Sequence, residues 1–583
     1  MNTTQPLSLH KDLKGKIIIL DFFTYCCINC MHILPDLKAL ENAFPVERGL
    51  VVIGVHSAKF ANERNTQNIV DAVQRYEISH PVVNDNGEQM WHQLCVNCWP
   101  TLIVIAPDLR PLLVLQGEGH RALLFALIEK AVEFYSKEGI LSNHRLTQIQ
   151  ITKSFNASKL SYPGKIATHK NSVTFSDSGN HRIILIQKFG SAEERIIDLK
   201  CNKVETLSGT GAQGFNRIGG KKGTNQILSS PWDVCINSEK TIVFIAMAGL
   251  HQIWAYFLAD TSLWGRSYSQ GVCAAVAGNG KEENRNNLYP MSSAFAQPSG
   301  ICISEETKAM FIADSESSSI RAIELGSGKV KAVVGGARDP HNLFAFGDTN
   351  GVGTTAQLQH PLGVAWNQNN QKLFVADTYN HKIKEINVKE NSAQTLKVDQ
   401  TLKEPTGLCF FGQKMLIADT NNHRILKYDP ESGKTEIVNI KLEGCKPSAK
   451  CKNIVKQDKI SISPKGGSLK MNLSVTLPNA CSITKGAPSK WLLSPPDTWK
   501  TIKAGSEEFQ LKDQFEFQVP EQNTEIKSSN LTAQVPLIIE CFVYYCTPTS
   551  TCSQHEFSIL LEVSYEEEAS SNASYDFSHS IIS

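Results

Sequence analysis

The stretch Asp21-Phe22-Phe23-Thr24-Tyr25-Cys26-Cys27-Ile28-Asn29-Cys30 decides the fold of the first part of this chain of 583 residues. It contains a Cys-x-x-Cys motif that follows a predicted β-strand, residues 15–23, and precedes a helical pattern over residues 31–44. Cys27 is therefore expected at the N-terminus of a helix, where free N–H groups and the helix dipole favour a thiolate. This position predicts a nucleophilic thiol.

The residues around the motif distinguish between two folds that share its spacing. Asp21 lies six residues before Cys27 in an otherwise apolar strand, Pro35 lies five residues after Cys30, and Trp99-Pro100-Thr101 opens another apolar run. These offsets resemble the thioredoxin fold, which has a buried acid before the motif, a proline in the following helix and a cis-proline beside the sulfurs. A zinc ribbon uses the same Cys-x-x-Cys spacing and is the alternative.

The resemblance covers about residues 10–140 and ends in a predicted helix, residues 120–135. A predicted strand, residues 50–55, and the segment Pro81-Val82-Val83-Asn84-Asp85 before a hairpin are more similar to the thiol-disulfide and peroxiredoxin-like branch than to short thioredoxins. The resemblance implies a thioredoxin-like domain over residues 1–140, followed by a linker, residues 141–160.

The resemblance also implies roles for four residues. Cys27 would be the attacking thiolate and Cys30 the buried resolving thiol. Asp21 would accept or relay the proton of Cys30, because burial near apolar groups raises the pKa of a carboxyl. Pro100, if cis, would hold an extended substrate strand beside the sulfurs. A thioredoxin fold kept as a scaffold, with no turnover, is the alternative.

Three features depart from the thioredoxin pattern. The dipeptide between the cysteines is Ile28-Asn29, which supplies no cation. Cys26 lies beside Cys27, and because adjacent cysteines rarely bridge, we interpret Cys26 as a packing residue. A second motif, Cys95-Val96-Asn97-Cys98, comes just before Pro100. Its cysteines are interpreted as structural thiols, with a regulatory thiol or a zinc site as alternatives.

Composition limits the classes of function. The chain is long enough for several domains, and its formal charge of +1 indicates no nucleic-acid partner. No segment is apolar enough for a membrane span, and residues 1–16 lack the apolar core of a secretion signal. Several of the 16 cysteines lie in apolar β-runs, as expected in a reducing compartment; examples are Cys235, Cys302 and Cys409. We expect a cytosolic monomer without cofactor or metal.

The middle of the chain repeats one unit five times. Each unit opens a strand with a proline and closes another in a turn related to Asp-(Ser/Thr)-x-Asn-His. The prolines are Pro163, Pro231, Pro298, Pro361 and Pro405, and the turns lie at residues 177–181, 247–251, 314–318, 377–381 and 419–423. Strand pairs that bury their faces only by stacking on neighbours predict a β-propeller. The motifs resemble NHL repeats and imply a propeller over residues 161–440.

The resemblance implies six blades, but the spacing indicates fewer. Between Asp177 and Pro231 one strand start and one turn are missing, although residues 196–205 resemble the outer half of a blade. Residues 394–405 are also shortened. We therefore expect an open or five-bladed ring that exposes a strand edge.

Two motifs within the repeats invite a functional interpretation that their placement disfavours. The turn histidines recur once per blade and should lie far apart, so a structural role is expected rather than a shared metal site; they are His181, His251, His381 and His423. The glycine-rich segment 209–214 lacks the helix and lysine of a phosphate-binding loop.

The last part of the chain predicts a small β-sandwich over residues 456–565. Polar and apolar residues alternate in its strands, which are expected at residues 469–477, 509–519, 535–545 and 556–563. Cys546 and Cys552 are placed as for a hairpin disulfide or a second dithiol, with accidental spacing as the alternative. Residues 566–583 are polar and expected to be disordered.

These observations favour two functions. The first is a thioredoxin-like, NHL-propeller protein that binds protein partners through the propeller and can exchange disulfides at Cys27 and Cys30, hence a possible thiol-disulfide oxidoreductase. The second is a redox-inactive scaffold. Peroxide reduction is disfavoured, because the Pro-x-x-x-Thr of the peroxidatic motif is absent before Cys27.

Overall fold

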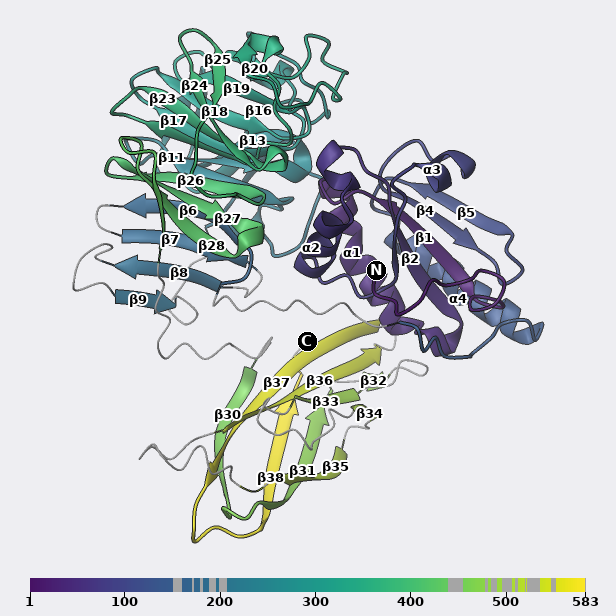
Figure 1. Ribbon diagram of the computed structural model, residues 1–583. Coiled ribbons are helices and arrows are strands. Elements are labelled where there is room, and N and C mark those ends of the chain that lie inside the picture. Colours follow the sequence, from purple (N-terminus) through teal and green to yellow (C-terminus); the bar gives the residue numbers. More distant parts are fainter. Residues whose placement is uncertain are drawn as a thin grey trace. The chain divides into compact units, whose positions relative to one another are not determined.

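Figure 1 shows the computed structural model of the chain. It describes residues 1–149, 160–169, 172–178, 182–187, 195–198, 207–438, 454–477, 481–483, 490–494, 506–508, 512–519, 521, 535–546 and 552–581. The chain divides into two compact units, Met1–Gly444 and Cys445–Ser583. Among the described residues, no helix has the length and apolar character needed to cross a membrane.

The first part of unit 1 is built on a five-stranded sheet in the order β3-β2-β1-β4-β5. Its strands are β1 (Ile17–Phe23), β2 (Leu50–His56), β3 (Val82–Asn84), β4 (Thr101–Ile105) and β5 (Pro111–Gln116). β1 runs parallel to β2 and antiparallel to β4. All seven residues of β1 are buried, as expected for a central strand that is covered on both faces.

Helices and loops cover the two faces of this sheet. The helices are α1 (Ile28–Ala43), α2 (Thr66–Arg75), α3 (Gln89–Gln93) and α4 (Arg121–Lys137), with short 3-10 turns η1 (Val46–Arg48) and η2 (Ala61–Arg64). Apolar residues of α1 and α4 pack on the face that carries Ile17 and Ile19, and the opposite face packs on the segment around α3. Lys16 Nζ donates to the carbonyls of Ser142 and His144, so this domain extends beyond the predicted boundary at residue 140.

The predicted order of strand, Cys-x-x-Cys and helix is confirmed. α1 begins at Ile28, and Cys27 is its N-cap residue. The helix starts three residues earlier than its apolar pattern predicts, because its first turn carries no periodic signal. Pro35 lies inside α1, and the Trp99–Pro100 peptide is cis.

Five antiparallel sheets of the described residues form the second part of unit 1 and are arranged as propeller blades (Figure 1). Blade 1 contains β6 (Pro163–His169), β7 (Ser172–Asp177), β8 (Arg182–Gln187) and β9 (Arg195–Asp198). Blade 2 contains β10 (Gly219–Lys222), β11 (Pro231–Ile236), β12 (Ile242–Met247), β13 (Gln252–Phe257) and β16 (Val272–Ala277), beside a hairpin of β14 (Thr261–Leu263) and β15 (Arg266–Tyr268). The predicted outer half of a blade, residues 196–205, is described only as far as residue 198, where it forms β9, pairs with β8 and belongs to blade 1.

The other three blades follow the same plan. Blade 3 contains β17 (Pro298–Ser304), β18 (Ala309–Asp314), β19 (Ser319–Glu324) and β20 (Val330–Gly335). Blade 4 contains β21 (Gly351–Val352), β22 (Gly363–Asn367), β23 (Lys372–Asp377), β24 (Lys382–Asn387) and β25 (Ser392–Thr395). Blade 5 contains β26 (Pro405–Phe411), β27 (Lys414–Asp419), β28 (Arg424–Tyr428) and β29 (Thr435–Ile437). The 3-10 turns are η4 (Gly223–Asn225), η5 (Ala248–Leu250), η6 (Pro290–Ser292), η7 (Gly353–Thr355), η8 (Thr378–Asn380) and η9 (Thr420–Asn422).

The turn histidines link one blade to the next. His251, His381 and His423 adopt the left-handed conformation, and the Nδ1 atom of each accepts a backbone N–H from the residue that precedes the first proline of a neighbouring blade. The N···N distances are 3.0–3.1 Å. The structural role predicted for these three histidines is confirmed, and His181 lies outside the described residues.

Among the described residues, one face of blade 2 has no neighbouring blade. The residue three positions after the blade proline packs on another blade in four cases, at Ile166, Ile301, Val364 and Leu408, which are 4–7 % exposed. The equivalent residue of blade 2, Val234, is 58 % exposed. The described residues therefore agree with the predicted five-bladed, incomplete ring.

Unit 2 is a β-sandwich. One sheet contains β30 (Ile454–Ile462), β37 (Cys552–Tyr565), β36 (Val535–Cys546), β33 (Lys490–Ser494) and β34 (Ser506–Glu508), with β32 (Ser482–Ile483) beside β36. The other contains β35 (Lys512–Val519), β31 (Gly467–Thr476) and β38 (Asn572–Ser580). Cys546 lies opposite Cys552 in the backbone register, and the disulfide and dithiol alternatives stay predictions.

The disorder predicted for residues 566–583 is wrong over most of its length. β38 pairs in parallel with β31 over Asn572–Ser580. Tyr575 and Phe577, two positions apart, are buried on the inner face and supply the alternation that forms a strand. The polar composition of this segment reflects its exposed face, so the sandwich extends past the predicted end at residue 565.

Candidate dithiol site and domain interface

The two cysteines of the motif lie together at the start of α1. Cys27 is partly exposed, whereas the side chain of Cys30 is fully buried. Burial raises the pKa of the Cys30 thiol well above its ordinary value, and its hydrogen bond with Cys27 and the nearby Asp21 charge act in the same direction. The structure thus provides one accessible thiol and, behind it, one that must lose a proton to react.

Asp21 supplies a carboxyl group near the buried thiol. Both of its oxygens are buried and make no hydrogen bond within the described chain. Burial raises the pKa of Asp21 to about 7, although the nearby His80 opposes this effect. Its neighbours in the sheet are Gly54 on β2 and Leu102 on β4, which offer no polar side chain. Asp21 can therefore accept a proton near neutral pH.

The position of Pro100 relative to the two cysteines follows from its neighbour Trp99. Trp99 packs in the same apolar cluster as Cys27 and Cys30, and the Pro100 carbonyl accepts a hydrogen bond from the Gly117 amide at 2.8 Å. The structure therefore brings Asp21, Cys27 and Cys30 together. It places the cis-proline Pro100 next to Trp99, which packs in the cluster of the two cysteines.

The remaining cysteines of this domain differ in environment. Cys26 is buried in the apolar cluster, as its interpretation as a packing residue predicts. Cys95 is an exposed free thiol, and Cys98 Sγ lies 3.7 Å from the Thr101 hydroxyl. The regulatory and zinc interpretations of Cys95 and Cys98 stay predictions.

Sequence reasoning missed that one residue position in each blade faces the thioredoxin-like domain. This is the position immediately before the blade proline, and its residues have φ between 46° and 59°. We call them the pre-proline residues; they are Tyr162, Ser230, Gln297, His360 and Glu404. Positive φ is uncommon for residues other than glycine, so the repeat holds each of these side chains in one defined direction.

Gln297 holds the backbone on both sides of Cys27. Its Oε1 atom accepts the Ile28 N–H at 3.0 Å, and its Nε2 atom donates to the Cys26 carbonyl at 3.1 Å. The first N–H groups of a helix have no partner within the helix. A propeller side chain therefore satisfies the first N–H group of the helix that carries the dithiol.

Glu404 binds three groups of the thioredoxin-like domain. Its carboxylate accepts hydrogen bonds from the Tyr25 hydroxyl at 3.3 Å, from Asn62 at 3.1 Å and from Arg75 at 3.3 Å. Glu404 and Arg75 are both largely buried. Ser230 contributes a further contact at 2.6 Å to His32 Nε2.

A second variable position supports the same surface. It is the x of the Asp-(Ser/Thr)-x-Asn-His turn, occupied by Glu316 in blade 3 and Tyr379 in blade 4. Glu316 forms a buried ion pair with Lys59, and Tyr379 packs on the rings of Tyr25 and Phe60. The available signal was that these positions vary in side chain more than the aspartate and histidine of the same turn, each of which is kept in four of the five repeats.

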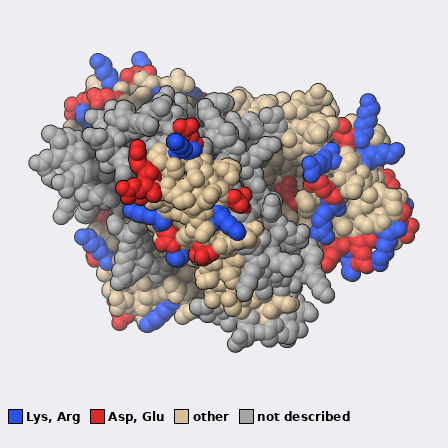
Figure 2. All heavy atoms as spheres, turned by 90° about the horizontal axis from the view of Figure 1, so that it is seen from below, with Lys and Arg blue, Asp and Glu red and all other residues tan. Residues whose placement is uncertain are grey.

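Charge on the visible surface is mixed. Figure 2 shows basic and acidic side chains interspersed among other residues, in keeping with the formal charge of +1. The buried ion pairs between the two domains are thus the more specific electrostatic feature of unit 1.

The fold and the dithiol define a class: a thioredoxin-like domain joined to an NHL-type β-propeller. A family model described as thioredoxin-like matches residues 15–110. The chain is 39 % identical to NHL repeat-containing protein 2 of Bos taurus, with 94 % of this chain and 87 % of the relative covered. The corresponding values for the Homo sapiens protein are 38 %, 94 % and 87 %. The chain belongs to the family of NHL repeat-containing protein 2.

Other similarities extend over different shares of the chain. Protein SUPPRESSOR OF QUENCHING 1, chloroplastic, of Arabidopsis thaliana is 36 % identical, with 98 % of this chain and 59 % of the relative covered. A crystal structure of a putative thiol:disulfide interchange protein DsbE from Chlorobium tepidum covers 21 % of this chain and 84 % of its own, at 20 % identity and a TM-score of 0.20. The bovine alignment spans 638 positions, more than the 583 residues of this chain, so it contains gaps.

Proposed function

We propose that this chain exchanges thiols and disulfides with protein partners, with Cys27 and Cys30 as the exchanging pair. The observation that carries the proposal is the different exposure of the two thiols, together with a carboxyl group near the buried one. Cys27 is partly exposed at the start of α1, Cys30 is buried behind it, and Asp21 is a proton acceptor with a pKa of about 7. An attacking thiol needs access, and a resolving thiol needs a base.

The proposed exchange has two covalent steps. The Cys27 thiolate attacks a client disulfide, forms a mixed disulfide and releases one client thiolate. Cys30 gives its proton to the Asp21 carboxylate and attacks the Cys27 sulfur. This step releases the second client thiolate and leaves a Cys27–Cys30 disulfide. A dithiol reductant then supplies two electrons and two protons to restore the thiols. In this scheme Pro100 aligns the extended client segment.

The proposed partner is a protein that binds to the propeller in the cytosol. The support is indirect: the loops of the propeller already provide the groups that contact the residues on either side of Cys27. A client that binds these loops would be held next to the accessible thiol. The balanced formal charge gives no support to a nucleic-acid partner.

One observation favours the second candidate, a redox-inactive scaffold. Gln297 occupies backbone groups of Cys26 and Ile28, so the propeller covers part of the surface around the dithiol. If this coverage excludes clients, the thioredoxin-like domain acts as a rigid adaptor.

A redox titration of the full chain separates the two candidates. Glutathione and dithiothreitol buffers, followed by alkylation and mass spectrometry, measure the fraction of Cys27–Cys30 disulfide. Exchange predicts a reversible disulfide near the potential of thioredoxin, roughly −270 mV. Cys27→Ser should abolish it, and Cys98→Ser, a change of a thiol in the same domain, should leave it unchanged. A pair that never forms a disulfide supports the scaffold.

A further inference from the structure

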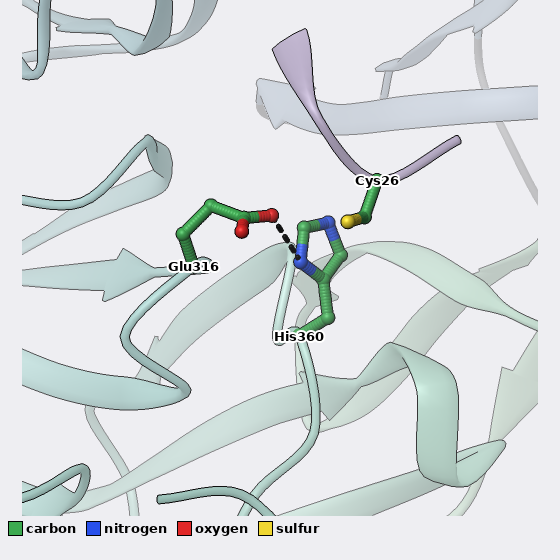
Figure 3. Close-up of side chains that lie close together, drawn as sticks. All are labelled: Cys26, Glu316 and His360. Carbon is green, nitrogen blue, oxygen red and sulfur yellow. Dashed lines mark ion pairs between the residues drawn. The ribbon is translucent and has the colours of Figure 1, made fainter. Parts of the chain in front are cut away.

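Three side chains that commonly bind metals meet at the interface of the two domains of unit 1 (Figure 3). Cys26 belongs to the thioredoxin-like domain, Glu316 to the turn after β18, and His360 to the pre-proline position of blade 4. One donor atom of each lies within 4.8 Å of the other two, and all three residues are buried. No other group of three such residues comes this close within the described chain.

Two of the donor atoms face each other. Glu316 Oε1 and His360 Nδ1 are buried 3.2 Å apart as an ion pair, and neither has a further partner within the described chain. Two ligands held at about 2.0 Å from a tetrahedral ion lie about 3.3 Å apart, so this separation suits a shared cation.

The buried charges also favour a dication. Glu316 and Glu63 contribute two carboxylates near Cys26, and Lys59 contributes one ammonium group that pairs with Glu316. With the His360 imidazole neutral, as a metal ligand requires, their sum is one negative charge. A divalent cation together with a Cys26 thiolate brings the sum to zero, which lowers the cost of burying these groups.

We propose that Cys26, Glu316 and His360 form a zinc site that joins the thioredoxin-like domain to the propeller. Thiolate, imidazole and carboxylate are all ligands of Zn²⁺, and the sulfur disfavours Mg²⁺ and Ca²⁺. The ligands come from two domains, so the site forms only when they are docked, and the metal stabilises the docked arrangement. This inference goes beyond the proposed disulfide exchange and replaces the expectation of no metal.

The competing arrangement contains the same residues without a metal. Figure 3 shows the imidazole of His360 between the carboxylate and the thiol, which also suits a chain of polar contacts from Glu316 to Cys26. That chain predicts a protein that binds no zinc at this place. The Cys27–Cys30 pair is a second competitor, because Cys-x-x-Cys is itself a zinc-binding spacing.

The test is zinc binding by the full chain, measured as metal content after dialysis with one equivalent of Zn²⁺, and by the thiolate-to-cobalt absorption band during Co²⁺ titration. We expect one equivalent in the wild type, in Cys27→Ser/Cys30→Ser and in the control Cys302→Ala. Cys26→Ala and His360→Ala should bind at least about tenfold more weakly and lose the absorption band.

A measurement of melting temperature with and without Zn²⁺ guards against misfolded variants. The wild type should melt higher with zinc, and Glu316→Gln, which keeps the shape of the side chain, should fold but respond less. Absence of bound metal in the wild type would overturn the proposal. So would metal that survives in His360→Ala but disappears in Cys27→Ser/Cys30→Ser, since it would then belong to the dithiol.

Discussion

The buried carboxyl of Asp21 should give the folded chain a pH dependence that Asp21→Asn removes. Its pKa is about 7 in the folded chain against 3.8 as the ordinary value. Between these values the folded chain binds a proton that the unfolded chain has released, so the stability that this group contributes falls as pH rises through the window. The total loss is about 4 kcal/mol, of which about 2.5 kcal/mol falls between pH 5 and pH 8.

Urea unfolding of the wild type and of Asp21→Asn at pH 5, 6, 7 and 8 measures this difference. The free energy of unfolding of Asp21→Asn, relative to the wild type, should rise by about 2.5 kcal/mol from pH 5 to pH 8. Asp36→Asn is a matched control on the same domain, since Asp36 only pairs with the exposed Arg121. It should follow the wild type within about 0.5 kcal/mol at every pH.

The same variant tests the chemical role of Asp21. If this carboxyl accepts the Cys30 proton, resolution of a mixed disulfide on Cys27 should slow by at least about tenfold in Asp21→Asn. Parallel stability curves for Asp21→Asn and the wild type between pH 5 and 8 would refute the reasoning. Asp21 would then not hold a proton near neutral pH, and the buried thiol would need another base.

Three further predictions concern the propeller and its interface. Val364→Ala should lower the free energy of unfolding by about 2 kcal/mol, because this valine is only 5 % exposed. Val234→Ala, at the equivalent position of blade 2, should change it by less than about 0.5 kcal/mol, because that valine is 58 % exposed. Equal losses for the two variants in urea titrations would show that this face of blade 2 is covered. Glu404→Gln should lower the free energy of unfolding by about 3 kcal/mol, because it leaves Arg75 buried without its counter-charge. Adding Arg75→Met to the same chain should restore part of this free energy. Additive losses in the double variant would contradict the pairing. Gln297→Ala should remove about 2 kcal/mol of docking energy and speed alkylation of Cys27. Gln359→Ala loses hydrogen bonds to Asn62, Tyr379 and Asn380 but none to the cysteine motif, so it should leave that rate unchanged; the same acceleration in both variants would mean general loosening.

The sequence predicted the elements whose signals are local. A Cys-x-x-Cys after an apolar strand identified the dithiol domain, and the repeated proline and turn identified the blades and the missing one. Two kinds of error have physical causes. The strand around Tyr575 and Phe577 was hidden because only one of its faces is apolar. The start of α1 was placed late because the first turn has no periodic pattern.

The interface could not be predicted from the sequence because its residues are neither close in the chain nor alike in type. Glu316, His360 and Glu404 come from different repeats, and each resembles an ordinary surface residue of a loop. They become buried only because the repeat turns the same position of each blade to one side. A comparison of the repeats for positions that vary more than the blade proline and the turn aspartate and histidine would have pointed to them.

The pre-proline residues of this interface differ in the support that their backbone receives from a neighbouring blade. Tyr162, His360, Gln297 and Glu404 each have their backbone N–H bound by a turn side chain of another blade. No such bond to the Ser230 N–H is found in the described chain, and Ser230 opens the blade whose face is exposed. Within the described residues, Ser230 thus lacks this backbone support, whereas Gln297, which contacts Cys26 and Ile28, and His360, which lies near Cys26, keep theirs. The proposed disulfide exchange and the proposed zinc site both depend on these two side chains, so neither proposal requires a closed ring.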